Sequence, residues 1–129
     1  MPGVWKVEGS GLAGDPPLIM GYFISDSGTA WTQASFGSIS LSAYTKSGDT
    51  LTLVSGPTAL TVSAVVFDTP QTDLNWDLNR YATGYNFRHR PAYAAPTVGT
   101  LYVYRVTFTP LSGAALKIDG DYRTDPRTT

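Results

Sequence analysis

The chain has 129 residues, a formal net charge of −1 and no cysteine. One domain of this length buries about two-thirds of the surface of the unfolded chain, so a core can form without disulfides or thiolate-bound metal. The balanced charge excludes the strong electrostatic attraction that nucleic-acid binding needs, and the abundance of threonine, serine and aspartate favours strands and turns over helices.

The first half of the chain is predicted to form five strands. Short apolar runs alternate with serine or threonine and end at glycine, proline or aspartate. The clearest alternation places Ile39, Leu41 and Ala43 on one face and serines on the other. The first strand is short and is expected to serve as an edge strand or arm. The predicted strands cover residues 4–8, 18–25, 39–44, 50–54 and 60–67.

The second half contains one irregular stretch and three further predicted strands. Residues 70–83 have no regular pattern, although residues 73–79 suffice for one helical turn. A strand is predicted over residues 84–90. A short glycine-containing turn then joins strands over residues 101–109 and 114–118 into a hairpin.

The strand over residues 101–109 is the strongest structural signal in the sequence. Because successive side chains of a strand point to opposite faces, its aromatic rings gather on one face. Leu101 and Val103 lie on the other face with Arg105, so that face is expected to be only half exposed. Burying the three rings stabilises the fold by about 10–20 kcal/mol as an upper bound. We therefore predict a structural core of Tyr102, Tyr104, Val106 and Phe108.

Seven or eight short antiparallel strands with turns between them are typical of an all-β sandwich. We expect one sandwich domain over residues 18–119, preceded by an arm and loop over residues 1–17 and followed by a tail over residues 120–129. The longest apolar run, residues 17–24, is much shorter than the about twenty residues of a membrane span. Residues 1–5 lack the pattern of a signal peptide, so we expect a protein made in the cytosol, or a mature or recombinant form, with no membrane partner.

Four segments of the chain are distinctive when taken together. They are Val-Val-Phe-Asp-Thr-Pro-Gln-Thr-Asp at 65–73, Thr-Gly-Tyr-Asn-Phe-Arg-His at 83–89, Gly-Thr-Leu-Tyr at 99–102 and Phe-Thr-Pro-Leu-Ser-Gly at 108–113. In this order they resemble small immunoglobulin-like β-sandwich proteins found among the virion genes of tailed bacteriophages. The resemblance covers roughly the second half of the chain and, more faintly, residues 34–44.

The resemblance implies an immunoglobulin-like sandwich, and its motifs are structural signatures, not catalytic ones. The family usually has an aspartate shortly before Thr-Gly-Tyr-Asn-Phe, and Tyr81 stands about there in this chain, so a polar anchor at that position is in doubt. Immunoglobulin-like domains also have a corner tyrosine whose hydroxyl bonds back to the backbone. Tyr102, just after Gly99, is the first candidate for this role, and Tyr85, two residues before Phe87, is the second.

His89 is the only histidine, and it stands between Arg88 and Arg90. A general base needs a partner and a pocket, and the two guanidinium groups are expected to lower the imidazole pKa. A small hydrolase, the enzymatic alternative, would also need a Gly-x-Ser-x-Gly elbow or a second histidine, which the chain lacks. A Gly-x-Gly-x-x-Gly match at residues 9–14 has no preceding buried strand and no following helix, so it is interpreted as a loop. We predict no catalytic residue and no cofactor.

Two groups of aspartates are candidates for a metal site, because clustered carboxylates can bind calcium. Neither group has the spacing and terminal glutamate of an EF-hand, so turns and solvated chain explain them more simply. We predict no metal site, with calcium as the alternative at both groups. The groups are Asp119, Asp121 and Asp125, and Asp68, Asp73 and Asp77.

Three arginines and three tryptophans are candidates for contacts with a protein partner. Arg88, Arg90 and Arg105 are expected on one polar strand face, where they either meet an anionic partner or pair with nearby aspartates. The tryptophans lie in predicted arms or loops. One is expected in the core, and the others either contact a partner or pack locally. They are Trp5, Trp31 and Trp76.

The resemblance implies a non-enzymatic virion structural protein of a tailed phage, such as a capsid-decoration, neck or tail accessory component. Such a protein would be assembled in the host cytoplasm and would contact other virion proteins as a homo-oligomer or as part of a large assembly. The alternative is a carbohydrate-binding or host-receptor-binding module. That alternative requires at least two exposed, coplanar aromatic residues among Trp5, Trp31, Trp76, Tyr81 and Tyr93.

Overall fold

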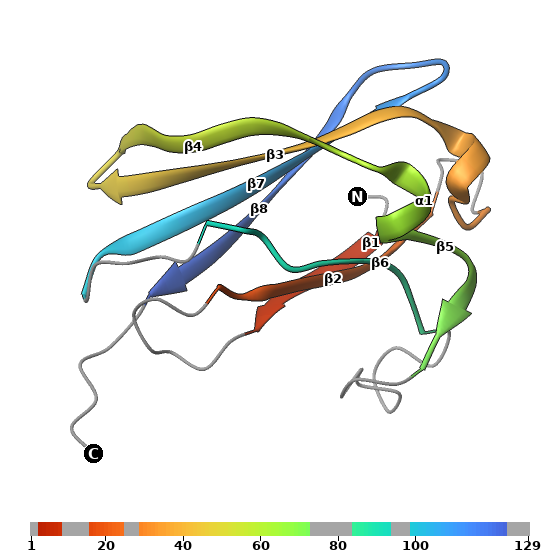
Figure 1. The fold of residues 1–129 in the computed structure, drawn as a ribbon, viewed down its shortest axis with the longest axis horizontal. Coiled ribbons are helices and arrows are strands. Elements are labelled where there is room, and N and C mark those ends of the chain that lie inside the picture. The colour runs from red at the N-terminus through yellow and green to blue at the C-terminus, as the bar shows by residue number, and fades with distance from the viewer. Residues whose placement is uncertain (1–2, 9–15, 25–28, 73–83, 94–98, 124–129) are drawn as a thin grey trace.

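The computed structural model describes residues 3–8, 16–24, 29–72, 84–93 and 99–123. These residues form two sheets of antiparallel strands that pack face to face (Figure 1). Sheet 1 has the order β1-β2-β6-β5, with β1 (Gly3–Glu8), β2 (Leu18–Phe23), β5 (Val66–Gln71) and β6 (Tyr85–His89). Sheet 2 has the order β4-β3-β7-β8, with β3 (Phe36–Ser47), β4 (Thr50–Leu60), β7 (Leu101–Pro110) and β8 (Leu116–Arg123).

The strand order is that of an immunoglobulin-like sandwich. In such domains one sheet has the order A-B-E-D, and the other contains C, F and G with an added C′ strand in the variable type. When the described strands are lettered along the chain with β4 as C′, sheet 1 becomes A-B-E-D and sheet 2 becomes C′-C-F-G. The chain is therefore a single all-β, immunoglobulin-like sandwich that contains a C-terminal hairpin of β7 and β8, as predicted.

The core lies between the sheets, and β7 supplies its largest side chains. Tyr102, Tyr104, Val106 and Phe108 are each at most 1% exposed. The ring centroid of Phe108 lies 5.1 Å from that of Phe23 in β2 and 5.1 Å from that of Phe87 in β6. Phe108 therefore joins the two sheets at the centre of an aromatic cluster.

Asn86 is a buried polar side chain in the middle of this apolar packing, and it is 2% exposed. Its Oδ1 accepts the backbone N–H of Phe23 at 2.9 Å. Its Nδ2 donates to the carbonyl oxygens of Phe23 at 2.9 Å and Trp31 at 3.1 Å. The side-chain amide therefore takes the place of a strand partner for Phe23 and fixes the segment that carries Trp31.

Both ends of the sandwich lie outside the predicted limits of the domain. β1 pairs with β2 along its whole length, and β8 continues to Arg123. Val7 of β1 packs against Gly120 of β8 so closely that a Cβ atom at Gly120 would overlap the Val7 side chain. The sheets therefore include part of the predicted arm, residues 1–17, and part of the predicted tail, residues 120–129.

The predicted strand over residues 60–67 is wrong. The chain leaves β4 and forms the short helix α1 (Val62–Val65) before β5 begins at Val66. Here the chain crosses from sheet 2 to sheet 1, and one helical turn makes that crossing. Residues three apart share a helix face, so Val62 and Val65 both pack against the core. The two valines therefore follow a helical period, although residues 60–64 alternate in the sequence as a strand would.

Three other predictions differ in length or lie beyond the described structure. The predicted strand over residues 50–54 is the first half of the longer β4. The irregular stretch over residues 70–83 and the glycine-rich loop at residues 9–14 fall mostly or wholly outside the described residues.

Candidate functional site

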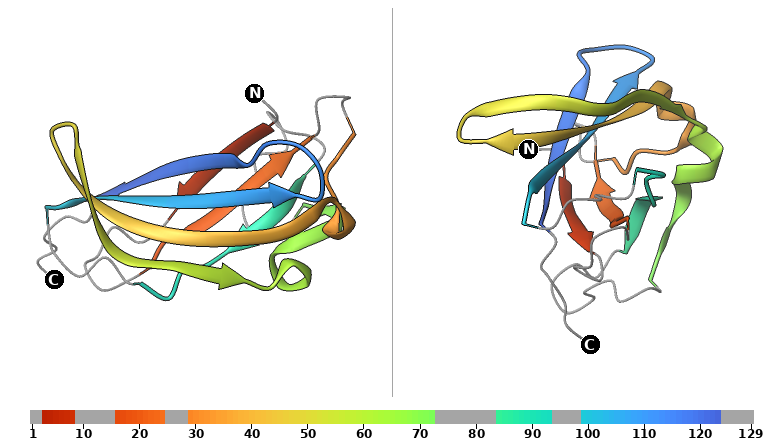
Figure 2. Two further views of the ribbon diagram at one scale, coloured as in Figure 1. Left: turned by 90° about the horizontal axis from the view of Figure 1, so that it is seen from above. Right: turned by 60° about the vertical axis from the view of Figure 1, so that its left-hand side comes forward.

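The hairpin of β3 and β4 reaches past the end of sheet 1, as Figure 2 shows. β4 is an edge strand of sheet 2, so one side of its backbone has no neighbouring strand among the described residues. Most of its side chains are exposed, including Leu53 (49% exposed) and Val54 (38% exposed). Residues 50–55, Thr-Leu-Thr-Leu-Val-Ser, contain no charge and no proline.

Edge strands in natural proteins usually carry charges, prolines or bulges that prevent pairing with another chain. From Val54 onward, β4 has two of these devices. Pro57 lacks a backbone N–H, and the register shift between Ala43 and Tyr44 produces a bulge at Val54. Residues 50–53 have none of them. Residues 50–53 of β4 are therefore open to strand pairing with a partner.

The outer face of sheet 2 carries a row of side chains that crosses all four strands. Leu53 of β4 is opposite Tyr44 of β3, and Tyr44 is opposite Val103 of β7. Val103 is in turn opposite Asp121 of β8. Opposite residues of an antiparallel pair share a face, so the row begins at the exposed edge strand and ends at a carboxylate.

Arg105 and Asp119 lie opposite each other beside this row. The Arg105 Nε donates to Asp119 Oδ1 at 2.7 Å, and a second guanidinium nitrogen donates to Oδ2 at 3.0 Å. The guanidinium carbon lies 5.2 Å from the centroid of the Tyr44 ring. The hydrogen bond to Asp119 raises the pKa of Arg105 above its ordinary value. We name Leu53, Tyr44, Arg105 and Asp119 the outer patch.

The three arginines expected on one face lie in different places. Arg105 is on the outer face of sheet 2, and its pairing with Asp119 agrees with the ion-pair alternative. Arg88 is on sheet 1, where it donates to the Tyr85 hydroxyl at 2.9 Å and lies 5.1 Å from the centroid of the Phe67 ring. Arg90 lies just beyond β6 and donates to the Pro16 carbonyl at 3.0 Å. The structure therefore does not unite them into one basic surface.

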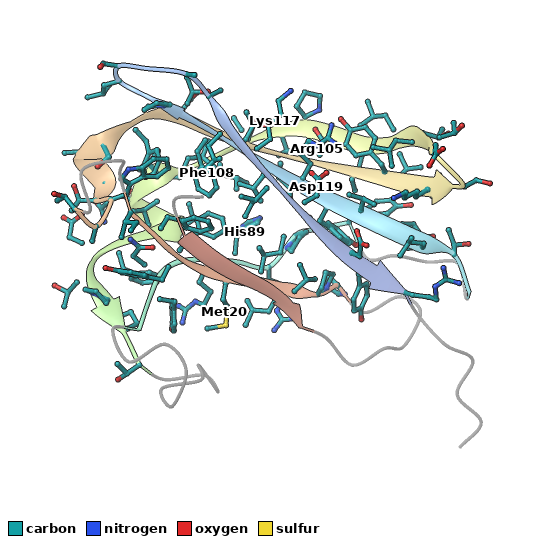
Figure 3. All side chains as sticks on the ribbon, turned by 180° about the vertical axis from the view of Figure 1, so that it is seen from behind. Met20, His89, Arg105, Phe108, Lys117 and Asp119 are labelled. Atoms are coloured by element: carbon teal, nitrogen blue, oxygen red, sulfur yellow. The ribbon has the colours of Figure 1, made fainter. Side chains whose placement is uncertain are left out.

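His89 points into the space between the sheets, where Figure 3 labels it. It is opposite Ile19 in the β2–β6 pair and lines a cleft with Arg90. Burial lowers its pKa from the ordinary value, as expected in direction, but the cause is the loss of water and not the neighbouring arginines. No carboxylate is among the described residues that line this cleft, so the triad-like partner that a general base needs is not found there.

Tyr104 makes a hydrogen bond from its hydroxyl to the backbone, the kind of bond expected of a corner tyrosine. Its hydroxyl donates to the carbonyl of Tyr93 at 2.8 Å. Burial, followed by the nearby phenols, raises the pKa of Tyr104 well above the ordinary value. Tyr102 lies next to this pair, with its ring centroid 5.9 Å from that of Tyr93. Tyr85, the second candidate for the corner tyrosine, accepts a hydrogen bond from Arg88 through its hydroxyl.

Trp31 is the tryptophan whose side chain the structure describes. Its ring centroid lies 4.9 Å from that of Phe36 and 6.0 Å from that of Phe108, in edge-to-face geometry. Trp31 is therefore part of the core packing and not a free contact residue. Trp5 lies in β1 opposite Gly21. Trp76 lies outside the described residues.

The aspartates form no described metal site. No group of three or more potential ligands occurs among the residues described. Asp119 is paired with Arg105, and Asp68 accepts the backbone N–H of Gln33 at 2.7 Å. Asp121 is exposed on β8. The remaining three, Asp73, Asp77 and Asp125, lie outside the described residues.

The fold and these sites define the class of the protein as an immunoglobulin-like β-sandwich. The chain matches no family model, no curated protein and no solved structure. No helix within the described part of the chain has the length and apolar character to cross a membrane.

Proposed function

We propose that this chain is a non-enzymatic structural protein of a tailed-phage virion that acts through protein–protein contacts. The proposal rests mainly on the uncharged edge of β4, at residues 50–53, which lies beside the outer patch. An edge strand of this kind supplies backbone donors and acceptors to an extended segment of a neighbouring subunit. The immunoglobulin-like sandwich and the sequence segments that resemble virion proteins support the same proposal.

The outer patch adds side-chain recognition to this backbone pairing. Tyrosine and arginine are enriched among the residues that dominate binding energy at protein interfaces. In the outer patch an arginine held by Asp119 is stacked over Tyr44, so both side chains are ordered before a partner arrives. An ordered contact residue loses less conformational entropy on binding, which favours assembly.

Leu53→Asp tests this function. The full chain would be added to phage particles assembled without it, and binding would be measured by co-sedimentation. The wild-type chain is expected to bind. Leu53→Asp places a charge on the exposed edge and should weaken binding about 30-fold or more, the effect of losing one dominant contact.

Leu111→Asp is the matched control, because Leu111 is also an exposed leucine (73% exposed) but lies between β7 and β8. It should bind as the wild type does. Equal losses in Leu53→Asp and Leu111→Asp would contradict the role of β4. If the wild-type chain bound no particle at all, the virion function would be wrong.

The carbohydrate-binding alternative has lost one of its five candidate aromatic residues. A stacking platform for sugars needs an exposed aromatic face, whereas Trp31 is packed against Phe36 and Phe108. Tyr93 is partly buried beside Tyr102. No observation on the described residues favours this alternative over assembly.

A further inference from the structure

A cleft of about 170 Å³ opens between the inner face of the β3–β4 hairpin and the end of β6. It exists because sheet 1 is incomplete at this point. β5 pairs with β6 only at Val66–Phe87 and at Gln71–Tyr85, so His89 has no β5 neighbour. β4 continues across the gap in the other sheet. The inner face of sheet 2 is therefore left uncovered by a strand at this corner.

The floor of the cleft is apolar. It is formed by Leu41 and Ala43 of β3, which are 7% and 2% exposed, together with Leu60 of β4. A dry cavity of about 150 Å³ is large enough to hold one benzene molecule. The cleft therefore has room for one aromatic ring or a short aliphatic chain.

The wall of the cleft carries hydrogen-bond donors and a positive charge. Ser55 and Thr58 supply hydroxyl groups, and Arg90 supplies a guanidinium. One guanidinium N–H is donated to Pro16, and the other donors have no partner among the described residues. His89 adds an imidazole whose pKa is lowered by burial, which favours the neutral ring, and a neutral imidazole has one N–H to donate.

Charge complementarity decides the kind of ligand. Arg90 repels a cation, and no carboxylate among the described lining residues would offset that repulsion. A neutral polyol would place hydroxyls against the apolar floor without partners, at a cost. A carboxylate meets the guanidinium in a charge-assisted pair, while an attached apolar group covers the floor.

We propose that this cleft binds a small organic carboxylate with an apolar body about the size of one aromatic ring. Its carboxylate contacts Arg90 and His89, and its apolar body packs against Leu41, Ala43 and Leu60. The cleft is lined by the later part of β4 and not by residues 50–53, so this binding can be tested apart from the proposed assembly function.

Benzoate is the probe for this site, and His89 is the reporter. Because His89 is the only histidine, its imidazole NMR signals are assigned without ambiguity. Titration of the isolated full chain with benzoate should shift these signals in a saturable way. Benzoate should also raise the apparent pKa of His89, because a bound anion favours the protonated ring. Benzyl alcohol, a neutral molecule of similar shape, should bind at least tenfold more weakly than benzoate, as expected for loss of a charge-assisted hydrogen bond.

Two variants test the residues of the cleft. Arg90→Gln should weaken benzoate binding about tenfold by removing the charge-assisted hydrogen bond. Arg123→Gln is the matched control, since Arg123 is likewise exposed and donates to one carbonyl, that of Gly99. Thr58→Phe should fill the cleft from an exposed position and abolish the benzoate shift.

Three results would overturn the proposal. The first is saturable benzoate binding that leaves the His89 signals unchanged, which would place the site elsewhere. The second is equal affinity for benzoate and benzyl alcohol, which would mean an apolar pocket only. The third is no benzoate binding to a folded wild-type chain. Each is measured without phage particles, so these results are distinct from failure of the assembly test.

Discussion

At the scale of single residues, Asn86 shows how one polar group shapes an apolar interior. Its amide satisfies three backbone groups of Phe23 and Trp31. Buried backbone groups left without partners cost more than an ordinary hydrogen bond contributes, because they lose their bonds to water. Asn86 therefore determines where the segment after β2 lies, and with it the place of Trp31 in the aromatic cluster.

Replacing Asn86 should be costly. Asn86→Ala removes the partners of the Phe23 N–H and the Trp31 carbonyl, so we expect the free energy of unfolding in urea to fall by about 2–4 kcal/mol. Gln71→Ala is the control, because the Gln71 amide bonds only to the nearby Thr69 carbonyl in an exposed position. It should change stability by less than about 0.5 kcal/mol. Equal effects of the two substitutions would contradict the structural role of Asn86.

His89 predicts a pH dependence of stability. Its folded-state pKa is lowered by burial, so the unfolded chain binds more protons between the folded pKa and the ordinary value of about 6.5. The free energy of unfolding should therefore rise with pH through this window and fall as the pH drops. The other charged or titratable groups that line the cleft with His89 are Arg90 and Tyr93. Burial raises the pKa of Tyr93, so this phenol stays neutral in that window.

His89→Gln isolates that contribution. Urea unfolding of the wild type and of His89→Gln would be measured at several pH values from about 5 to 7.5. Subtracting one curve of unfolding free energy against pH from the other removes the contribution of the aspartates, which both proteins share. The wild type should lose stability relative to His89→Gln as the pH falls below about 6.5. Parallel curves would show that the imidazole titrates as it does in water.

At the scale of elements, the contact between β1 and β8 closes one side of the sandwich. These strands belong to different sheets, and they meet where Val7 lies over Gly120. A glycine here provides space that any side chain would fill. In the sequence Gly120 stands at the start of a polar C-terminal stretch, so neither the end of β8 nor its contact with β1 was predicted.

Substitution at this contact tests the packing. Gly120→Ala introduces a Cβ that overlaps Val7, and overpacking of this kind costs about 1–3 kcal/mol of unfolding free energy. Adding Val7→Ala should recover part of that loss, so the double variant should be more stable than the sum of the single effects predicts. The measurement is a double-mutant cycle in urea. Additive effects would show that the two side chains do not touch.

At the scale of the whole molecule, the fold class followed from the sequence because alternation along β7 and the turn residues are local signals. The core row from Tyr102 to Phe108 is a clear example. What could not be predicted depends on contacts between distant segments. The helical turn α1 arises from a crossing between sheets, and the stacking of Arg105 on Tyr44 depends on the register of β3 against β7. The cleft depends on how far β5 extends along β6, which no local pattern encodes.

The opposite positions of β4 and β8 in sheet 2 have a practical consequence for studying this protein. β8 packs with β1, so the first and last strands lie together at the edge of the sandwich that is remote from the β3–β4 hairpin. The turn that leads from β7 into β8 contains Leu111, which is 73% exposed. A fluorophore at Leu111 would lie away from the open backbone of β4 and from the outer patch, so particle binding could be followed in real time with little interference from the dye.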